Sequence, residues 1–127
     1  MSFAFDPALP LVILQAELQG PSANGFVRLV LDTGATDTII NEEIILSLGY
    51  DPTLAPERFE ITMGSGIGLV TVVSVDRIVA LGQEHTNFPV LCHTLPPSVE
   101  VDGVLGLDFL RGHVLTVDFI NGEITLN

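Results

Sequence analysis

The sequence predicts an all-β domain, a closed or partly closed barrel with one or two short helices. Three observations favour this class. Residues 121–122 are Asn-Gly between two apolar runs, which is the strongest short-range signal for a β-hairpin. Residues 20–25, Gly-Pro-Ser-Ala-Asn-Gly, form a dense turn signal between two other apolar runs. Residues 59–63 alternate apolar and polar side chains with the period of a strand.

The first elements follow from these turns. Pro10–Gln19 is predicted to pair with Phe26–Leu31 as a hairpin across residues 20–25. The return strand is nearly all apolar, with Arg28 as the exception, so we expect it to be buried on both faces.

A short helix is predicted after residue 41. Asn41 is a good N-cap, Glu42 and Glu43 fall in the first turn where the helix dipole favours acids, and Gly49 can end the helix. The predicted buried face consists of Ile44, Ile45 and Leu48.

The second half is predicted to begin with a long hairpin. Residues 51–57 carry two prolines and are expected to form a loop, followed by a strand over 59–63 and a return strand over 69–75. The Gly-rich residues between these strands have little side chain to hold their backbone still.

The remaining elements are short. Strands are expected at 78–81 and 88–92, joined at 82–83, and residues 95–101 are expected to form a surface connection. The pattern then predicts a helix of about a turn and a half over 107–111, closed at Gly112. A last hairpin is predicted from strands 113–119 and 123–126.

One tripeptide carries the chemistry. Asp32-Thr33-Gly34 occurs once and directly follows the apolar strand 26–31. Glycine lets the backbone approach closely and leaves amide donors free to face the carboxylate, an arrangement that suits acid/base catalysis. Other acids stand in no such turn, and they are interpreted as loop, helix-start and strand-edge residues: Asp102, Asp108 and Asp118.

Residues 30–38 resemble the active-site loop of the retropepsin-like aspartic peptidases, whose half-size chains form homodimers that each contribute one Asp. Two further segments match in the right order. Val104-Leu105-Gly106 resembles the segment that crosses behind the catalytic loop and leads into a short helix, and residues 63–68 resemble the tip of the mobile flap. The resemblance covers roughly residues 25–120.

The resemblance implies a retropepsin-like closed β-barrel, the acid protease fold, with a flap hairpin and one or two short helices. It also implies a homodimeric aspartic endopeptidase, because 127 residues are too few for two Asp-Thr-Gly lobes and are expected to form a single domain, 1–127. Asp32 would be the catalytic carboxyl, Thr33 would hydrogen-bond across the dimer axis, and Gly34 would leave space and backbone donors beside the carboxylates.

The same resemblance implies a cleft for extended peptides or proteins with apolar side chains at the scissile bond. Ile67 would cover the substrate from the flap tip, with flanking glycines as pivots. The residues expected in the substrate-binding region are Ala35, Asp37, Gly66, Ile67, Gly68, Val104 and Leu105.

The chain departs from the retroviral pattern at one pair of positions. Retroviral enzymes often pair an acid directly after the Ala of Asp-Thr-Gly-Ala with an Arg directly after the Gly of the downstream motif. Here the two positions are Thr36 and Leu107, so that ion bridge is absent. Asp37, Asp108 or the terminal strands are candidates for its replacement, and the sequence does not choose among them.

No metal or cofactor is expected. Adjacent residues on a strand point to opposite faces, so Cys92 and His93, with His85, do not form a recognisable metal site. The single cysteine is interpreted as a buried thiol in a reducing, cytoplasmic setting. Residues 64–68 lack the Gly-x-Gly-x-x-Gly spacing of a nucleotide loop and precede a strand in place of the required helix.

Composition narrows the partners. Four Arg, no Lys and 16 acids give a formal net charge of -12, which makes nucleic acid a poor partner. Mean hydropathy is high at +0.54, yet no apolar run approaches the roughly 18 residues of a membrane span, and the apolar patch at 11–14 lacks the flanks of a signal peptide. The excess aliphatic surface is free for self-association.

The alternative to an enzyme is a non-catalytic dimerisation or peptide-binding module with the same fold.

Overall fold

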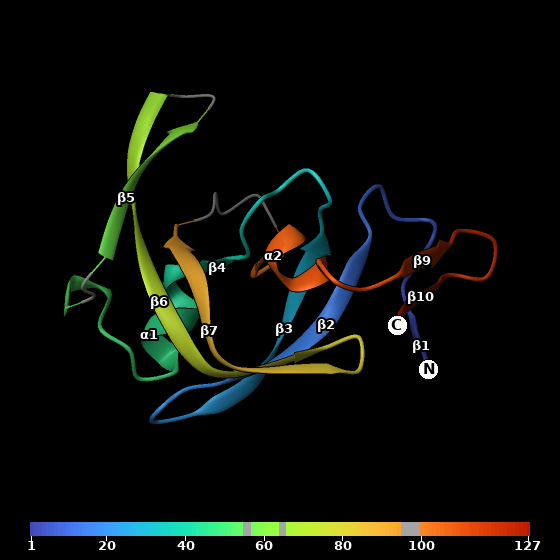
Figure 1. The fold of residues 1–127 in the computed structure, drawn as a ribbon, viewed down its shortest axis with the longest axis horizontal. Helices are drawn as coiled ribbons and strands as arrows, with labels where there is room; N and C mark the ends of the chain where they lie inside the picture. The colour runs from blue at the N-terminus through green and yellow to red at the C-terminus, as the bar shows by residue number, and fades with distance from the viewer. Residues whose placement is uncertain (55–56, 64–65, 95–99) are drawn as a thin grey trace.

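Six strands form a closed ring in the computed structural model, which describes residues 1–54, 57–63, 66–94 and 100–127. The order is β2-β3-β8-β4-β7-β6, and pairing of β2 with β6 closes the ring (Figure 1). The strands are β2 (Ile13–Gln19), β3 (Asn24–Leu31), β8 (Gly103–Leu105), β4 (Ile39–Asn41), β7 (Gln83–His93) and β6 (Gly66–Ala80). The expected closed β architecture is therefore confirmed.

Large apolar side chains fill the interior. Fully buried residues come from strands far apart in sequence, which is what a closed barrel requires of inward-facing positions. They include Leu18, Leu29, Ile40, Ile78, Val90 and Leu105. Within the described ranges, no helix is long and apolar enough to cross a bilayer.

A second, three-stranded sheet holds both chain ends. Its order is β1-β10-β9, from β1 (Ser2–Ala4), β10 (Glu123–Leu126) and β9 (Leu115–Asp118), and Figure 1 shows it at one end of the molecule. Ile124 and Leu126 join the core. The hairpin β9–β10 is predicted correctly, whereas β1 is not predicted because a three-residue strand has no detectable alternation.

A long hairpin stands out from the barrel. Strand β5 (Glu57–Met63) pairs with the first part of β6, and Figure 1 shows the two strands rising together beside the ring. The predicted separate strand at 78–81 is wrong: it is the end of β6, which runs unbroken from hairpin to barrel. The turn into β7 lies at Leu81 and Gly82, both with positive φ as a two-residue primed turn demands, one residue earlier than expected.

Two short helices and one 3₁₀ turn complete the fold: α1 (Glu42–Ser47), α2 (Leu107–Leu110) and η1 (Pro52–Leu54). The N-cap prediction is confirmed, since the Asn41 side chain accepts a hydrogen bond from the Glu43 amide at 3.3 Å. Gly49 follows α1 with φ of 101°, a conformation that glycine adopts without strain.

Strand β3 corrects one expectation. Its side chains alternate between buried and exposed positions, and Phe26 is 68% exposed while Val27 and Leu29 are buried. The prediction that both faces are buried is wrong for the single chain. The outer face of β3 carries apolar residues that the barrel does not cover.

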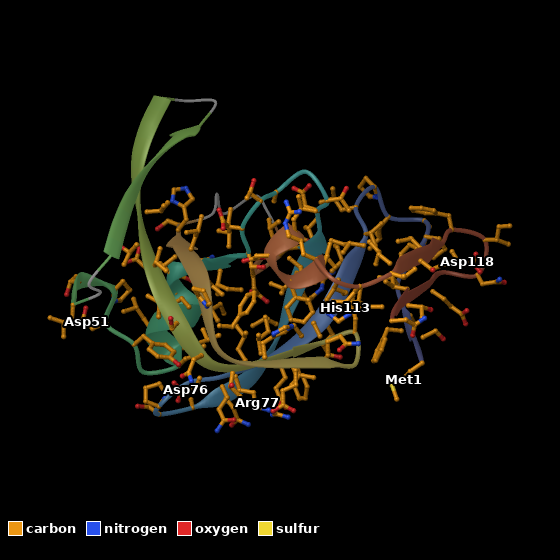
Figure 2. All side chains as sticks on the ribbon, in the orientation of Figure 1. Met1, Asp51, Asp76, Arg77, His113 and Asp118 are labelled. Atoms are coloured by element: carbon orange, nitrogen blue, oxygen red, sulfur yellow. The ribbon has the colours of Figure 1, made fainter. Side chains whose placement is uncertain are left out.

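Strand β6 has an additional side-chain contact where the hairpin joins the barrel. The ladder with β7 skips the pair Asp76 and Asn87, where Asn87 has φ of 50°. The Tyr50 hydroxyl contacts β6 at this position: it donates to Asp76 Oδ1 at 2.8 Å and accepts from the Asp76 amide at 2.8 Å. Figure 2 shows Asp76 beside Arg77, on the side of the barrel away from the hairpin.

The Tyr50 contact predicts a pH-dependent stability. Burial and the Asp76 carboxylate raise the pKa of Tyr50 from 10.0 to about 12. Because the folded state holds this proton more tightly than the unfolded state, the contribution is complete below pH 10 and is lost as the pH rises through about 12. We expect Tyr50→Phe to lower stability at neutral pH by about 0.5–1.5 kcal/mol per lost hydrogen bond and to flatten the alkaline decline.

Urea unfolding at pH 7 to 11.5 measures this effect. Tyr50 is the sole tyrosine in the sequence, so tyrosinate absorbance reports its ionisation alone. A tyrosinate midpoint near 10 in the folded protein would contradict the predicted contact.

Candidate active site

The candidate catalytic residue lies where a barrel strand ends. Strand β3 pairs in parallel with β8, with Leu31 opposite Leu105, and the next residue is Asp32. The Asp32 amide donates to the Leu105 carbonyl at 3.1 Å. The buried strand β8 therefore fixes the backbone from which the Asp32 carboxyl projects.

The Asp-Thr-Gly turn holds the carboxyl of Asp32. Gly34 N donates to Asp32 Oδ1 at 2.8 Å, and the Ala35 amide donates to the Asp32 carbonyl at 3.2 Å. Asp32 is half-buried, whereas Thr33 and Gly34 are exposed. Within the described part of the chain, Gly34 supplies the only hydrogen bond to this carboxyl, so it remains accessible for chemistry.

The downstream glycine segment crosses directly beneath this loop, as the sequence predicts. A Cβ atom on Gly106 would lie 2.7 Å from the carbonyl carbon and oxygen of Asp37 and 2.9 Å from the Ala35 oxygen. A Cβ on Gly103 would collide with the Ile39 carbonyl. Only residues without side chains allow this approach of two backbones.

Most of the predicted site residues lie near Asp32, but they differ in how far they are exposed. Ala35 is half-buried and Asp37 is exposed on the loop, and Val104 is half-buried on β8 beneath it. Leu105 is fully buried. Its side chain therefore belongs to the core and not to a surface that a ligand can reach, which corrects the expected substrate contact.

The flap residues belong to a separate element, the hairpin β5–β6. Gly66, Ile67 and Gly68 lie in β6, paired with Met63, Thr62 and Ile61 of β5. The expected flap tip, residues 63–68, includes residues 64–65, which lie outside the described residues.

Cys92 is buried, and His85 packs against aromatic rings. Cys92 is buried, and burial, followed by the nearby Glu42 charge, raises the pKa of its thiol to about 11. His85 packs edge-on against Phe109 with ring centroids 4.9 Å apart and lies 5.4 Å from Phe88. The interpretation of Cys92 as a buried thiol is confirmed, and His85 is a packing residue.

Comparison with known families identifies the family of this chain. The family model of the gag-polyprotein putative aspartyl protease matches residues 19–112, well over half of the chain. The chain belongs to this family of retropepsin-like aspartyl proteases.

A solved structure supports the fold of this family member. The crystal structure of a retropepsin-like aspartic protease from Rickettsia conorii is similar, with a TM-score of 0.74 and 20% sequence identity over 100% of this chain and 89% of that chain. At this identity, the likeness establishes the retropepsin-like fold. No curated protein matches the sequence.

One buried polar residue of this retropepsin-like site is not predicted from the sequence. Thr38 is fully buried at the end of the Asp32 loop, and its hydroxyl donates a hydrogen bond to Asp108, which follows the glycine segment beneath the loop. The available signal is a lone hydroxyl directly before the apolar pair Ile39-Ile40. That signal is weak, because threonine is common in strands.

The crossing predicts that Gly106→Ala is severe. The added methyl would meet backbone atoms that cannot move without displacing the Asp32 loop, so we expect a loss of about 1–3 kcal/mol or more in stability and a loss of any activity. Urea unfolding and circular dichroism would measure the change. Gly25→Ala is the matched control, because a Cβ there meets nothing within 4 Å. Equal stability of the two variants would contradict the crossing.

Proposed function

We propose that this chain is a homodimeric aspartic endopeptidase in which each protomer supplies one Asp32 carboxyl. The observation that carries the proposal is the turn itself: a half-buried carboxyl, bonded to the Gly34 amide and fixed by a buried strand, at a loop tip whose Thr33 and Gly34 are exposed. An exposed tip allows a second copy of the same loop to approach. Membership of the aspartyl protease family supports the same reading.

Two Asp32 carboxyls facing one another across a two-fold axis would share one proton. Two like charges a few ångströms apart cannot both ionise cheaply, so the pair titrates as a unit. Aspartic proteases are the established example of such a shared proton. The ionised carboxyl takes a proton from a bound water, which attacks the peptide carbonyl, while the protonated carboxyl donates to the carbonyl oxygen. A proton then reaches the leaving nitrogen, and no metal or organic cofactor takes part.

The substrate is proposed to be an extended peptide segment with apolar side chains. Half-buried Ala35 and Val104 supply apolar surface near Asp32, and exposed Asp37 supplies a polar rim. The hairpin β5–β6 stands out from the barrel, where it can close over such a segment and exclude water (Figure 1). In this role Ile67 of β6 would cover the substrate, with Gly66 and Gly68 as pivots beside it.

The terminal sheet is the proposed source of dimer contacts. Its ends carry exposed apolar side chains: Val114 is 66% exposed, Phe119 63% and Ile120 92%. Within the described ranges, β9 and β1 each pair on one side alone, so their outer edges can accept a strand of the partner. The single buried cysteine agrees with a reducing, cytoplasmic setting for the dimer.

Loss of the Asp32 carboxylate is the direct test. We expect Asp32→Asn to lower kcat on an unfolded protein substrate by about 10²–10⁴-fold, because an amide can neither accept the water proton nor share one. Glu43→Gln is the matched control, since it removes the same charge from the exposed first turn of α1. Cleavage would be followed from pH 4 to 7, with the oligomeric state measured in the same samples.

The same experiment separates the alternative, a non-catalytic dimerisation or peptide-binding module. The missing ion bridge at Thr36 and Leu107 favours this module. Equal cleavage by wild type and Asp32→Asn, or none by a confirmed dimer across pH and salt, would support it. Cleavage that disappears with Asp32 alone supports the enzyme.

Net charge makes a prediction about assembly. Each protomer carries a formal charge of -12, so two protomers repel one another over the Debye length of about 8 Å at physiological salt. We expect the dimer to tighten when salt rises towards 1 M and when mild acid protonates carboxylates. Sedimentation velocity across both series measures this. A dimer that weakens in both series would contradict the prediction.

A further inference from the structure

The loop that bears Asp32 is anchored at its far end by a carboxylate from another element. Asp108, in the first turn of α2, accepts from the Thr38 hydroxyl at 2.7 Å through Oδ1 and from the Thr38 amide at 3.0 Å through Oδ2. Oδ1 also accepts from the Phe109 amide at 2.9 Å. Thr38 is fully buried and Asp108 is half-buried, and 70 positions separate them, so the contact is tertiary.

The hydroxyl of Thr38 is used twice. While it donates to Asp108, it accepts from the Gly106 amide at 3.1 Å, in a buried position. A buried hydroxyl is costly unless it is bonded, and here both its donor and an acceptor site are occupied. Two backbone hydrogen bonds lie beside this contact: Leu107 N donates to Ala35 O at 2.8 Å, and Asp108 N donates to Thr36 O at 3.2 Å.

Both ends of the loop therefore rest on one short segment. The near end is held by the Leu105 carbonyl, which accepts from Asp32 N, and the far end is held by Asp108 through Thr38. A displacement of the far end changes the curvature of the loop and hence the direction in which the Asp32 carboxyl points.

We propose that Asp108 is a positioning residue that orients the Asp32 loop through Thr38, in place of an ion bridge between positions 36 and 107. The inference rests on the proposed function for its kinetic consequence. An acceptor-only group is required at Asp108, since its three partners are all donors. An amide of the same shape would turn its NH₂ towards one of these donors, so Asn is not a conservative replacement.

Three variants test the proposal in the dimer. Asp108→Asn removes an acceptor, Thr38→Val removes the hydroxyl with little change of shape, and Thr38→Ser keeps it. We expect the first two to lower kcat by on the order of tenfold to a hundredfold with KM within about twofold, since small misplacements of a reacting group have effects of this size. Thr38→Ser is expected to retain most of the wild-type kcat.

The matched control is Asp102→Asn. Asp102 also accepts a tertiary backbone hydrogen bond, from Arg28 N at 2.8 Å, but at the end of the β3–β8 ladder away from the Asp32 turn. We expect it to lose stability with kcat per folded dimer unchanged. If Asp108→Asn behaves in the same way, the contact is merely structural and the proposal is wrong. If Asp108→Asn does not fold, the comparison of Thr38→Val with Thr38→Ser decides by the same criterion.

A second readout is independent of activity. Gly34 N donates to Asp32, so amide hydrogen exchange at Gly34 reports how well the turn is held. We expect Thr38→Val to accelerate this exchange and Thr38→Ser to leave it near the wild-type rate. Unchanged exchange in both variants would overturn the positioning role. An inactive wild type with accelerated exchange in Thr38→Val would count against the proposed function and leave the positioning role standing.

Discussion

The site depends on a steric condition: two backbones cross without side chains between them. Residues 103–106 pass so close beneath the loop of residues 35–39 that a methyl group on Gly103 or Gly106 would strike backbone atoms. This closeness lets β8 pair with both β3 and β4, which completes the barrel, and brings Leu105 within hydrogen-bond reach of Asp32. Barrel closure and placement of the carboxyl are thus consequences of the same contact.

Hydrophobic burial supplies the stability around this crossing, and hydrogen bonds supply its direction. Leu29 and Leu105 are fully buried on either side of the base of the loop, so the strand ends cannot drift apart without exposing apolar area to water. Burial is not directional, however, and would not by itself orient a carboxyl. The Gly34 amide and the Thr38–Asp108 contact are directional, and they act on the two ends of the loop.

Local signals predict much of this structure, and non-local contacts account for what they miss. The Asn41 cap and the Asn121-Gly122 turn follow from residues a few positions apart, so the sequence predicts them well. Strand β6 continues without a break because β2 and β7 pair with it. From the sequence alone, the polar residues 76–77 indicate the end of one strand and the start of another. The Thr38–Asp108 contact joins residues 70 positions apart, and neither residue has a local pattern that indicates the other.

The continuity of β6 has a mechanical consequence. A single strand of 15 residues connects the projecting hairpin with the wall of the barrel, and its Asp76 amide donates a hydrogen bond to the Tyr50 hydroxyl. Strand β6 pairs with β7 on both sides of Asp76, and the Tyr50 hydroxyl binds the Asp76 amide between these paired stretches. The position of the projecting arm therefore depends partly on a contact on the side of the barrel away from the hairpin (Figure 2). Substitutions at Tyr50, Asp76 or Asn87 therefore change how the arm is held without altering the Asp32 loop.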